Sequence, residues 1–295
     1  MGQLHDIVRA SNHASESAGV DQTEDILANG GVWNELDEDD QTPGCIAYEK
    51  GLQRLYDTFV RAGIRSEVLL GRLERRIPHE RDDGAAFLAS QLKSTDDMLV
   101  DEQGNAVMMA WETDIMKRSA QALLPHAGMR VLNIGFGMGI FDSFVREASP
   151  AEHTIVEAHP HVLARLQKDH WEELPGVRIL AGRWQDLVDA IQEKEYDAIY
   201  YDPYGDYYDD LYAFTDIVVN TLAPEGRFSF FNGLGADRQI SYDVYQRVVE
   251  IDLAECAAKV EWHTISMDSP IDWKSTRRPY WKVKEYRLPV CRHSS

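Results

Sequence analysis

The second half of the chain alternates between short apolar runs and longer segments in which apolar positions recur with helical spacing. The apolar runs stand at residues 131–134, 153–156, 177–180, 198–201 and 226–231, and two more stand at 260–265 and 281–288. Short runs that are each followed by a helical stretch predict buried strands joined by helices. This order specifies an α/β fold with a mostly parallel, seven-stranded sheet and helices on both faces, and the last two strands predict an antiparallel pair.

The N-terminal part of the chain shows a different pattern, that of short helices joined by turns. Two apolar helix ends closed by a glycine, at residues 26–30 and 59–63, lie 33 residues apart. Residues 42–51 follow the order T-P-x-x-x-A-x-x-x-G, which resembles a degenerate ankyrin repeat, although a generic helical hairpin would show a similar pattern. Because stacked repeats need about three units to bury a core, we expect residues 1–74 to pack against residues 75–295.

A glycine-rich turn follows the first predicted strand of the sheet. Residues 131–134 run directly into Gly135, Gly137 and Gly139, and a helical pattern begins at once. Without Cβ atoms the backbone can turn sharply, approach a ligand closely and present the N–H groups of the new helix to it. The spacing G-x-G-x-G, in place of the G-x-G-x-x-G of dinucleotide binders, indicates S-adenosylmethionine. A tight strand-to-helix turn alone would show the same glycines.

An acidic residue ends the second predicted strand. Glu157 stands 22 residues after Gly135, and Pro160 opens the next helix, where its missing N–H costs nothing. In doubly wound sheets an acid at this strand end accepts hydrogen bonds from the two ribose hydroxyls. Strand, glycine turn, helix, strand and acid therefore stand in the order expected for a Rossmann-like S-adenosylmethionine site.

The composition is that of an ordinary globular protein. Of the 295 residues, 44% are hydrophobic and 27% are charged. There is no run of 18 apolar residues that could span a membrane, and the N-terminus lacks the basic and apolar regions of a signal peptide. The three cysteines stand far apart without C-x-x-C spacing, so we expect no disulfide and no bound metal. A reducing compartment, the cytoplasm or the nucleus, fits this cysteine usage.

The net charge narrows the choice of partner. Fifty acidic residues against thirty basic ones give a formal charge of −20. Nucleic-acid affinity requires a basic face, so we expect no direct binding to nucleic acid. An acidic protein instead attracts cationic partners, such as an arginine- or lysine-rich substrate. The same surplus of acids would also serve solubility alone.

Several motifs together resemble one family. Trp111-Glu112-Thr113, the glycine turn, Trp184 and Tyr201-Asp202 look like guanidinoacetate methyltransferase. The resemblance is closer still to a relative of that enzyme, the type IV protein arginine methyltransferase, or arginine δ-N-methyltransferase. That family shows four runs that stand here at residues 133–140, 157–160, 182–186 and 230–239, with further matches at 33–37 and 65–67 in front, where it carries degenerate ankyrin repeats.

The resemblance implies a class I methyltransferase that methylates the internal (δ) nitrogen of arginine in a protein. S-adenosyl-L-methionine would be the methyl donor and S-adenosyl-L-homocysteine the product. The resemblance also implies, loosely, a ribosomal protein as the basic substrate, and we expect a monomer that binds no membrane. Two departures from the family pattern stand out. The region in front of the catalytic domain is shorter, and Pro203 follows Asp202 where a threonine or similar residue is usual.

The residues that would hold the cofactor follow from the resemblance. The glycine turn would surround the methionine moiety, Glu157 would bind the ribose, and residues 183–185 would close over the adenine. Met108 and Met116 would line the pocket, although core packing explains methionines equally well. The full set is Phe87, Met108, Met116, Gly135, Phe136, Gly137, Met138, Gly139, Ile140, Glu157, Ala158, His159, Arg183, Trp184, Gln185 and Asp202.

Two carboxylates, Glu112 and Asp202, are the candidate catalytic residues. A guanidinium is planar and stays protonated at neutral pH, so two carboxylates can each accept a fork of its N–H donors. If they grip the two terminal nitrogens, the internal nitrogen is left facing the methyl group, and Asp202 can take the proton. The alternative for Glu112 is a helix cap, since acids favour the first turn.

The substrate entrance is expected at the same edge of the sheet. Asn232 and Asp237 follow the fifth predicted strand, and Tyr204 follows the fourth. The acidic residues in 206–210 would attract a basic segment. A glycine-rich turn without substrate contact explains residues 232–238 as well.

Three other functions fit parts of the pattern. Methylation of a small guanidine is the main alternative, but metabolite enzymes rarely need a docking segment in front. Asp202-Pro203-Tyr204 also resembles a motif of enzymes that methylate exocyclic nitrogens of nucleic-acid bases, which the acidic charge disfavours. A binding scaffold with a vestigial pocket is disfavoured by the intact glycines and carboxylates.

Overall fold

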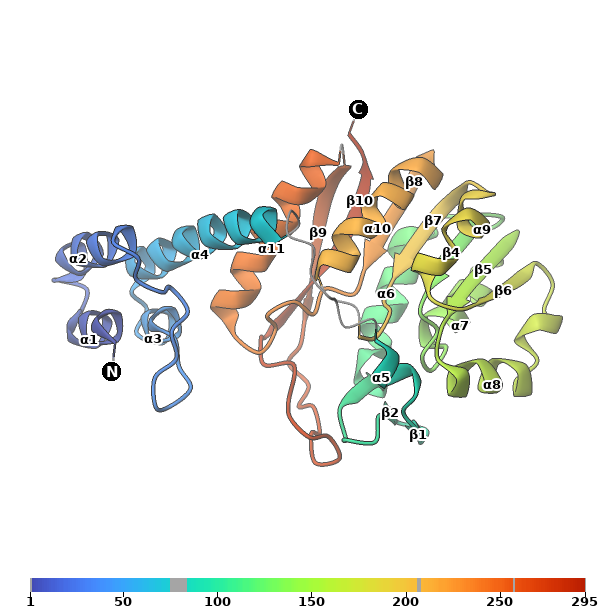
Figure 1. Cartoon of the computed structure of the whole chain (residues 1–295), viewed down its shortest axis with the longest axis horizontal. Helices are drawn as coiled ribbons and strands as arrows, with labels where there is room; N and C mark the ends of the chain where they lie inside the picture. The colour runs from blue at the N-terminus through green and yellow to red at the C-terminus, as the bar shows by residue number, and fades with distance from the viewer. Residues whose placement is uncertain (1, 75–83, 206–207, 257, 295) are drawn as a thin grey trace. The chain divides into compact units, whose positions relative to one another are not determined.

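The computed structural model describes residues 2–74, 84–205, 208–256 and 258–294 (Figure 1). Two compact units divide the chain. The first unit comprises residues 1–79, 233–251 and 280–283, and the second comprises residues 80–232, 252–279 and 284–295. The expected domain boundary lies between residues 74 and 75, and residues 75–83 lie outside the described residues. The two-domain division therefore stays a prediction.

The second unit is built on a seven-stranded sheet. Its strands are β4 (Arg130–Ile134), β5 (Glu152–Glu157), β6 (Val177–Ala181), β7 (Tyr196–Tyr201), β8 (Leu222–Phe230), β9 (Ala258–Ser266) and β10 (Glu285–His293). They lie in the order β6-β5-β4-β7-β8-β10-β9, with β10 antiparallel to both of its neighbours and the other neighbouring pairs parallel. This order, with a reversed strand next to the edge, is the sheet of class I methyltransferases, and it confirms the predicted Rossmann-like fold.

The last strand lies further along the chain than the apolar pattern predicted. The expected strand covered residues 281–288, but β10 starts at Glu285 and ends at His293. The reason lies in Trp281, whose indole Nε1 donates a hydrogen bond to the Val283 carbonyl (2.9 Å) and whose ring packs edge-on against Tyr242. Residues 280–283 thus belong to the first unit, and antiparallel pairing starts only after them.

Helices cover both faces of the sheet, as predicted. The second unit carries α6 (Thr113–Leu123), α7 (Ile140–Glu147), α8 (Pro160–Lys168), α9 (Val188–Gln192) and α10 (Tyr208–Thr221). Successive side chains of a strand point to opposite faces. In β7, Tyr200 stacks on Phe141 of α7 with 4.0 Å between ring centroids, while Tyr201 packs against Phe214 of α10 at 4.7 Å. Helices α6 and α8 share the core of α7, and α9 packs beside α10.

A small antiparallel sheet precedes the large one. It consists of β1 (Lys93–Ser94), β2 (Met98–Val100) and β3 (Ala106–Met109), and the 3₁₀-helix η1 (Ala110–Glu112) follows. The β2–β3 turn is fixed by Asp101, whose Oδ1 accepts the backbone N–H groups of Gln103 and Asn105 (both 2.8 Å). This sheet and η1 position Met108 and Glu112, two of the predicted site residues.

The first unit contains four N-terminal helices and most of α11 (Gln239–Glu255). They are α1 (Gln3–Ala10), α2 (Glu16–Ala28), α3 (Pro43–Glu49) and α4 (Gln53–Glu74). Helix α3 begins at the Thr-Pro pair, because the Thr42 hydroxyl accepts the Cys45 N–H (3.1 Å). Helices α2 and α3 pack on α4, and α1 packs on both. The helical segment is confirmed, whereas its ankyrin-like character stays a prediction.

The N-terminal helices hold α11 within the first unit. The Glu67 carboxylate of α4 accepts hydrogen bonds from Trp33 Nε1 (3.3 Å) and from the Tyr245 hydroxyl of α11 (3.2 Å). The two helices approach closely at Gly63, where a Cβ would lie 2.7 Å from Val244. The N-terminal segment therefore packs on a helix that comes from residues 75–295.

Removal of residues 1–74 is expected to destabilise the rest of the chain. It would expose Ile240 and Val244 of α11, which are fully buried. Each burial contributes ~1.5–3 kcal/mol, so the melting temperature should fall by about 10 °C or the fragment should aggregate. Differential scanning calorimetry measures the shift. Arg61→Ala, at a side chain on α4 that is 61% exposed, should melt like the full chain. Equal melting of the truncated and full chains would contradict this prediction.

No helix in the described ranges combines the length and the apolar run that a membrane crossing requires. The three cysteines, Cys45, Cys256 and Cys291, are free thiols. Within the same described ranges, no group of three or more His, Cys, Asp or Glu side chains is arranged to hold a metal ion.

Candidate active site

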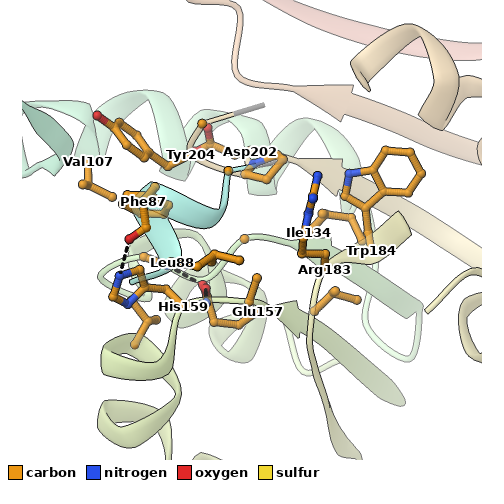
Figure 2. A pocket seen from close by; sticks show the side chains of 18 of the residues that line it. Phe87, Leu88, Val107, Ile134, Glu157, His159, Arg183, Trp184, Asp202 and Tyr204 are labelled. Carbon is orange, nitrogen blue, oxygen red and sulfur yellow. Dashed lines mark hydrogen bonds between the residues drawn. The ribbon is translucent and has the colours of Figure 1, made fainter. Parts of the chain in front are cut away.

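A pocket lies at the carboxyl ends of β4, β5 and β7, the edge at which parallel sheets bind ligands (Figure 2). The space within it amounts to about 730 Å³ when the open solvent at its mouth is included. The predicted residues that line it are Phe87, Met108, Gly135, Gly137, Glu157, Ala158, His159, Arg183, Trp184, Gln185, Asp202 and Tyr204. The structure therefore brings together most of the predicted cofactor site.

Two glycines of the turn border the pocket. Gly135 has φ +89°, and a Cβ there would lie 2.5 Å from the Asp202 carbonyl oxygen, so glycine is required where the ends of β4 and β7 meet. Gly137 has φ +56° and lines the pocket. The following N–H, that of Met138, donates to the Met108 sulfur (3.2 Å), which ties the turn to β3.

Phe136, Met138 and Ile140 of this turn pack in or against the core. Gly139, with φ +73°, is the N-cap of α7, and a Cβ there would lie 2.4 Å from the Phe136 ring. Phe136 is buried against Trp171, with 5.0 Å between ring centroids. The resemblance placed the whole turn around the cofactor. In the structure Phe136, Met138, Gly139 and Ile140 are not pocket-lining residues, because the start of α7 turns this part of the chain toward the core.

Backbone donors hold the Glu157 carboxylate at the end of β5. Its Oε2 accepts the N–H groups of Phe136 (2.9 Å) and Gly137 (3.4 Å), and its Oε1 accepts that of His159 (2.7 Å). Burial raises the pKa of this carboxyl above its usual value, and the backbone N–H groups offset only part of that rise. The carboxylate is thus fixed where ribose hydroxyls could bond to its remaining lone pairs.

A short helix, α5 (Ala85–Leu88), forms one wall of the pocket. It places the Phe87 ring between those of His159 (4.8 Å between centroids) and Tyr204 (4.6 Å). His159 Nδ1 accepts the His161 N–H (3.1 Å), so the proton lies on Nε2, which donates to the Phe87 carbonyl (3.1 Å), as Figure 2 shows. Burial lowers the pKa of His159 and favours this neutral form.

Residues 183–185 line another wall of the pocket, and Figure 2 shows Arg183 and Trp184 across from Phe87. Trp184 is buried edge-on against Phe214, with 5.1 Å between ring centroids. With its amide oriented to accept both donors, Gln185 receives hydrogen bonds from Trp184 Nε1 (3.1 Å) and from the Arg183 guanidinium (3.2 Å). These bonds hold the three predicted residues as one surface beside the pocket.

The two candidate catalytic carboxylates interact electrostatically. Asp202 follows β7 and lines the pocket, and its N–H donates to the Ile134 carbonyl (2.9 Å). Glu112 ends η1 and is buried. Burial raises the pKa of Asp202 well above its usual value, and the charge of Glu112 raises it further. Such a pair favours a cationic ligand, because a positive charge relieves both the repulsion and the desolvation of the carboxylates.

Glu112 does not act as a helix cap. It occupies the N-cap position of α6, but its side chain makes no capping hydrogen bond. It lies outside the lining of the cofactor pocket, and its charge acts on Asp202, which lines that pocket.

The two predicted methionines divide between pocket and core. Met108 lines the pocket. Met116 does not, because α6 directs it into the core, where it is fully buried and its sulfur accepts the Tyr200 hydroxyl (3.3 Å). Met116 is therefore a core residue, which is the alternative that the sequence left open.

The three predicted entrance residues have different surroundings. Tyr204 lines the pocket, and burial raises the pKa of its hydroxyl. Asn232 is buried, where its N–H donates to the Tyr286 hydroxyl and its Nδ2 to the Arg287 carbonyl (both 3.0 Å), so it ties β8 to β10. Asp237 belongs to the first unit. Residues 206 and 207 of the acidic stretch lie outside the described residues.

Sequence patterns missed several neighbours of the site. The additional lining residues include Leu88, Val107, Val162, Pro203 and Gly205. The connection between β9 and β10 also reaches the β2–β3 turn, where the Arg277 N–H donates to the Gly104 carbonyl (2.7 Å). No local motif signals contacts between segments so far apart in the chain.

The residues of the pocket fit S-adenosylmethionine. Gly135 and Gly137 border the pocket with positive φ angles, and Glu157 presents an oriented carboxylate at the end of β5. The carboxylates of Glu157 and Asp202 also suit the positive charge of a sulfonium. The chain's cofactor is therefore S-adenosylmethionine, and these residues are the candidates to hold it.

Comparison with known proteins agrees with this geometry. The family model for guanidinoacetate N-methyltransferase matches residues 85–236. Protein arginine N-methyltransferase 2 of Aspergillus fumigatus is 44% identical over 321 residues, which cover 90% of this chain and 76% of the relative. The Saccharomyces cerevisiae protein of the same name is 36% identical, with 92% of this chain and 77% of the relative covered. This chain belongs to the protein arginine N-methyltransferase 2 family.

Proposed function

We propose that this protein transfers a methyl group from S-adenosylmethionine to the internal (δ) nitrogen of an arginine side chain in a protein substrate, the type IV reaction. The observation that carries the proposal is the pair of interacting carboxylates, Glu112 and Asp202, beside the cofactor pocket. The names of the relatives support arginine as the target, and the matching family model supports a guanidine.

The two carboxylates would hold the guanidinium by its terminal nitrogens. Carboxylates bind guanidinium through strong charge-assisted N–H bonds, and two of them can occupy both terminal nitrogens. With both terminal nitrogens occupied, the internal nitrogen is the one left to face the methyl donor. S-adenosylmethionine supplies an electrophilic methyl group on its sulfonium sulfur when bound.

Asp202 would accept the proton that the internal nitrogen loses. A protonated guanidinium has no free electron pair on this nitrogen, so attack requires loss of delocalisation and of a proton. The raised pKa of Asp202 makes it a stronger base than an ordinary aspartate. The walls formed by α5 and residues 183–185 would position the reactants and exclude water.

Mass spectrometry of methylated arginine tests the position of transfer. The protein is incubated with isotope-labelled S-adenosylmethionine and candidate basic proteins, ribosomal proteins among them. Fragmentation distinguishes δ-methylarginine from arginine methylated at a terminal nitrogen. We expect the δ product, and terminal monomethylation would contradict the proposed grip on the two terminal nitrogens.

Guanidinoacetate is the matched small-molecule substrate for the same assay. The family model favours it, but the relatives are named for protein substrates, so we expect turnover of guanidinoacetate to be far slower than that of a protein arginine. The proposed partner is therefore a basic protein, in the cytoplasm or the nucleus.

Binding of an arginine ligand is expected to release protons. Burial and Glu112 raise the pKa of Asp202, so below that raised pKa the empty site holds a proton that the guanidinium must displace. Affinity should therefore rise as the pH increases through this pKa and fall as the pH drops below it. Calorimetry with an arginine peptide and S-adenosylhomocysteine, in two buffers of different ionisation enthalpy, counts the protons released.

Glu112→Gln should reduce this proton release, because it removes the charge that raises the pKa of Asp202. Equal heats in the two buffers and an affinity independent of pH would contradict the coupling between the two carboxylates.

A further inference from the structure

We propose that Asp142 and His153, two buried residues outside the pocket lining, are positioning residues that set the shape of the glycine turn for cofactor binding. Asp142 lies in the first turn of α7, and His153 lies in β5. They act through Asn133, the residue of β4 that stands two positions before Gly135. The inference concerns cofactor binding alone and does not depend on the position of methyl transfer.

The network ties the first carbonyl of the turn to two other elements. Asn133 Nδ2 donates to the Gly135 carbonyl (2.8 Å) and to Asp142 Oδ1 (2.9 Å). His153 Nε2 lies 3.0 Å from the same Asp142 oxygen. One amide group therefore connects the turn to α7 by hydrogen bonds, and His153 of β5 lies against the Asp142 carboxylate.

A second set of contacts reaches the turn from the side of Phe136. The Phe136 ring packs edge-on against Trp171 (5.0 Å between centroids), and Trp171 in turn lies edge-on to His153 (6.4 Å). His153 thus lies beside both Asp142 and Trp171, which contact the turn through Asn133 and Phe136. The turn's next two N–H groups, those of Phe136 and Gly137, bond to Glu157, so its shape decides where Glu157 points.

This network is unfavourable for stability. Asn133 is 1% exposed, and Asp142 and His153 are 0% exposed. Asn133 Oδ1, Asp142 Oδ2 and both ring nitrogens of His153 have no hydrogen-bond partner in the described part of the chain. Buried polar atoms without partners destabilise a fold, and apolar groups of the same shape are often neutral or better. A polar cluster of this kind is expected where a binding site needs it.

Calorimetric titration with S-adenosylhomocysteine, together with melting temperatures, tests the proposal. We expect Asp142→Leu to raise Kd by about tenfold or more, because the turn loses its anchor, while its melting temperature equals or exceeds that of the wild type. Asp142→Asn keeps an oxygen for Asn133 and should bind close to wild-type strength. His153→Phe should weaken binding in the same direction as Asp142→Leu.

Thr23→Val is the matched control. Thr23 lies in α2 of the first unit, and its buried hydroxyl also lacks a hydrogen-bond partner among the described residues. The substitution should leave the Kd for S-adenosylhomocysteine unchanged. Unchanged Kd in Asp142→Leu would overturn the proposal. So would a loss of affinity in Asp142→Leu and Asp142→Asn that follows a parallel loss of melting temperature, since the residues would then only support the fold. If Asp142→Leu does not fold, His153→Phe decides by the same two readouts.

Discussion

Asp202→Asn and Glu112→Gln should each lower turnover by ~10²-fold or more, the usual scale for a general base or an electrostatic clamp. Asp202→Asn removes the proton acceptor, and either change removes one of the two carboxylates that would hold the guanidinium. Affinity for S-adenosylhomocysteine should stay near that of the wild type in Glu112→Gln, because Glu112 lies outside the lining of the pocket. Steady-state kinetics and calorimetry measure the two quantities.

Melting temperature separates this loss from misfolding. Each substitution removes a carboxylate that burial and a like charge destabilise, so neither variant should melt below the wild type. Asp114→Asn is the matched control, at a carboxylate two residues after Glu112 that is 60% exposed, and it should retain full turnover. Wild-type turnover in both Asp202→Asn and Glu112→Gln would refute the proposed clamp.

Gly135→Ala should abolish cofactor binding at accessible concentrations, a loss of about 100-fold or more. The new Cβ would lie 2.5 Å from the Asp202 carbonyl oxygen and 3.0 Å from Pro203 Cα. Both are backbone atoms, so the ends of β4 and β7 must separate. That movement also displaces Asp202, so any residual turnover should fall further than binding does.

Substitutions at two other glycines show whether the loss of binding comes from the collision or from backbone strain. Gly128 also has a positive φ, +80°, but a Cβ there meets nothing within 4 Å, so Gly128→Ala carries backbone strain of ~1–2 kcal/mol without a collision. Gly137→Ala meets the flexible end of Met108 at 3.1 Å and should weaken binding only moderately. Equal affinities for S-adenosylhomocysteine in the Gly135 and Gly128 variants would show that the collision is harmless.

Strands β4, β5 and β7 were predictable because each is buried on both faces and therefore reads as a largely apolar run. The same rule misplaced β10. Trp281 and Val283 are apolar and buried, but they pack in the first unit. Hydrophobicity tells that a residue is buried and does not tell which element covers it.

The candidate site was predictable where a motif is local. The glycine turn with Glu157 at the end of the next strand follows from the spacing along two neighbouring elements. Asn232 shows the opposite case, since its motif is equally distinctive, yet its side chain ties β8 to β10. A motif marks a position with strict requirements, and those requirements can be structural.

The amino-acid sequence by itself determined the class of fold, the pocket edge of the sheet and the chemical types of the residues there, because these depend on local periodicity and on backbone freedom at glycine. Only the tertiary structure decided that Met116 belongs to the core, that the charge of Glu112 acts on Asp202, and that Asn133 joins the glycine turn to Asp142. Those relations join segments far apart in the chain, and their energies arise from packing and desolvation that no local pattern records.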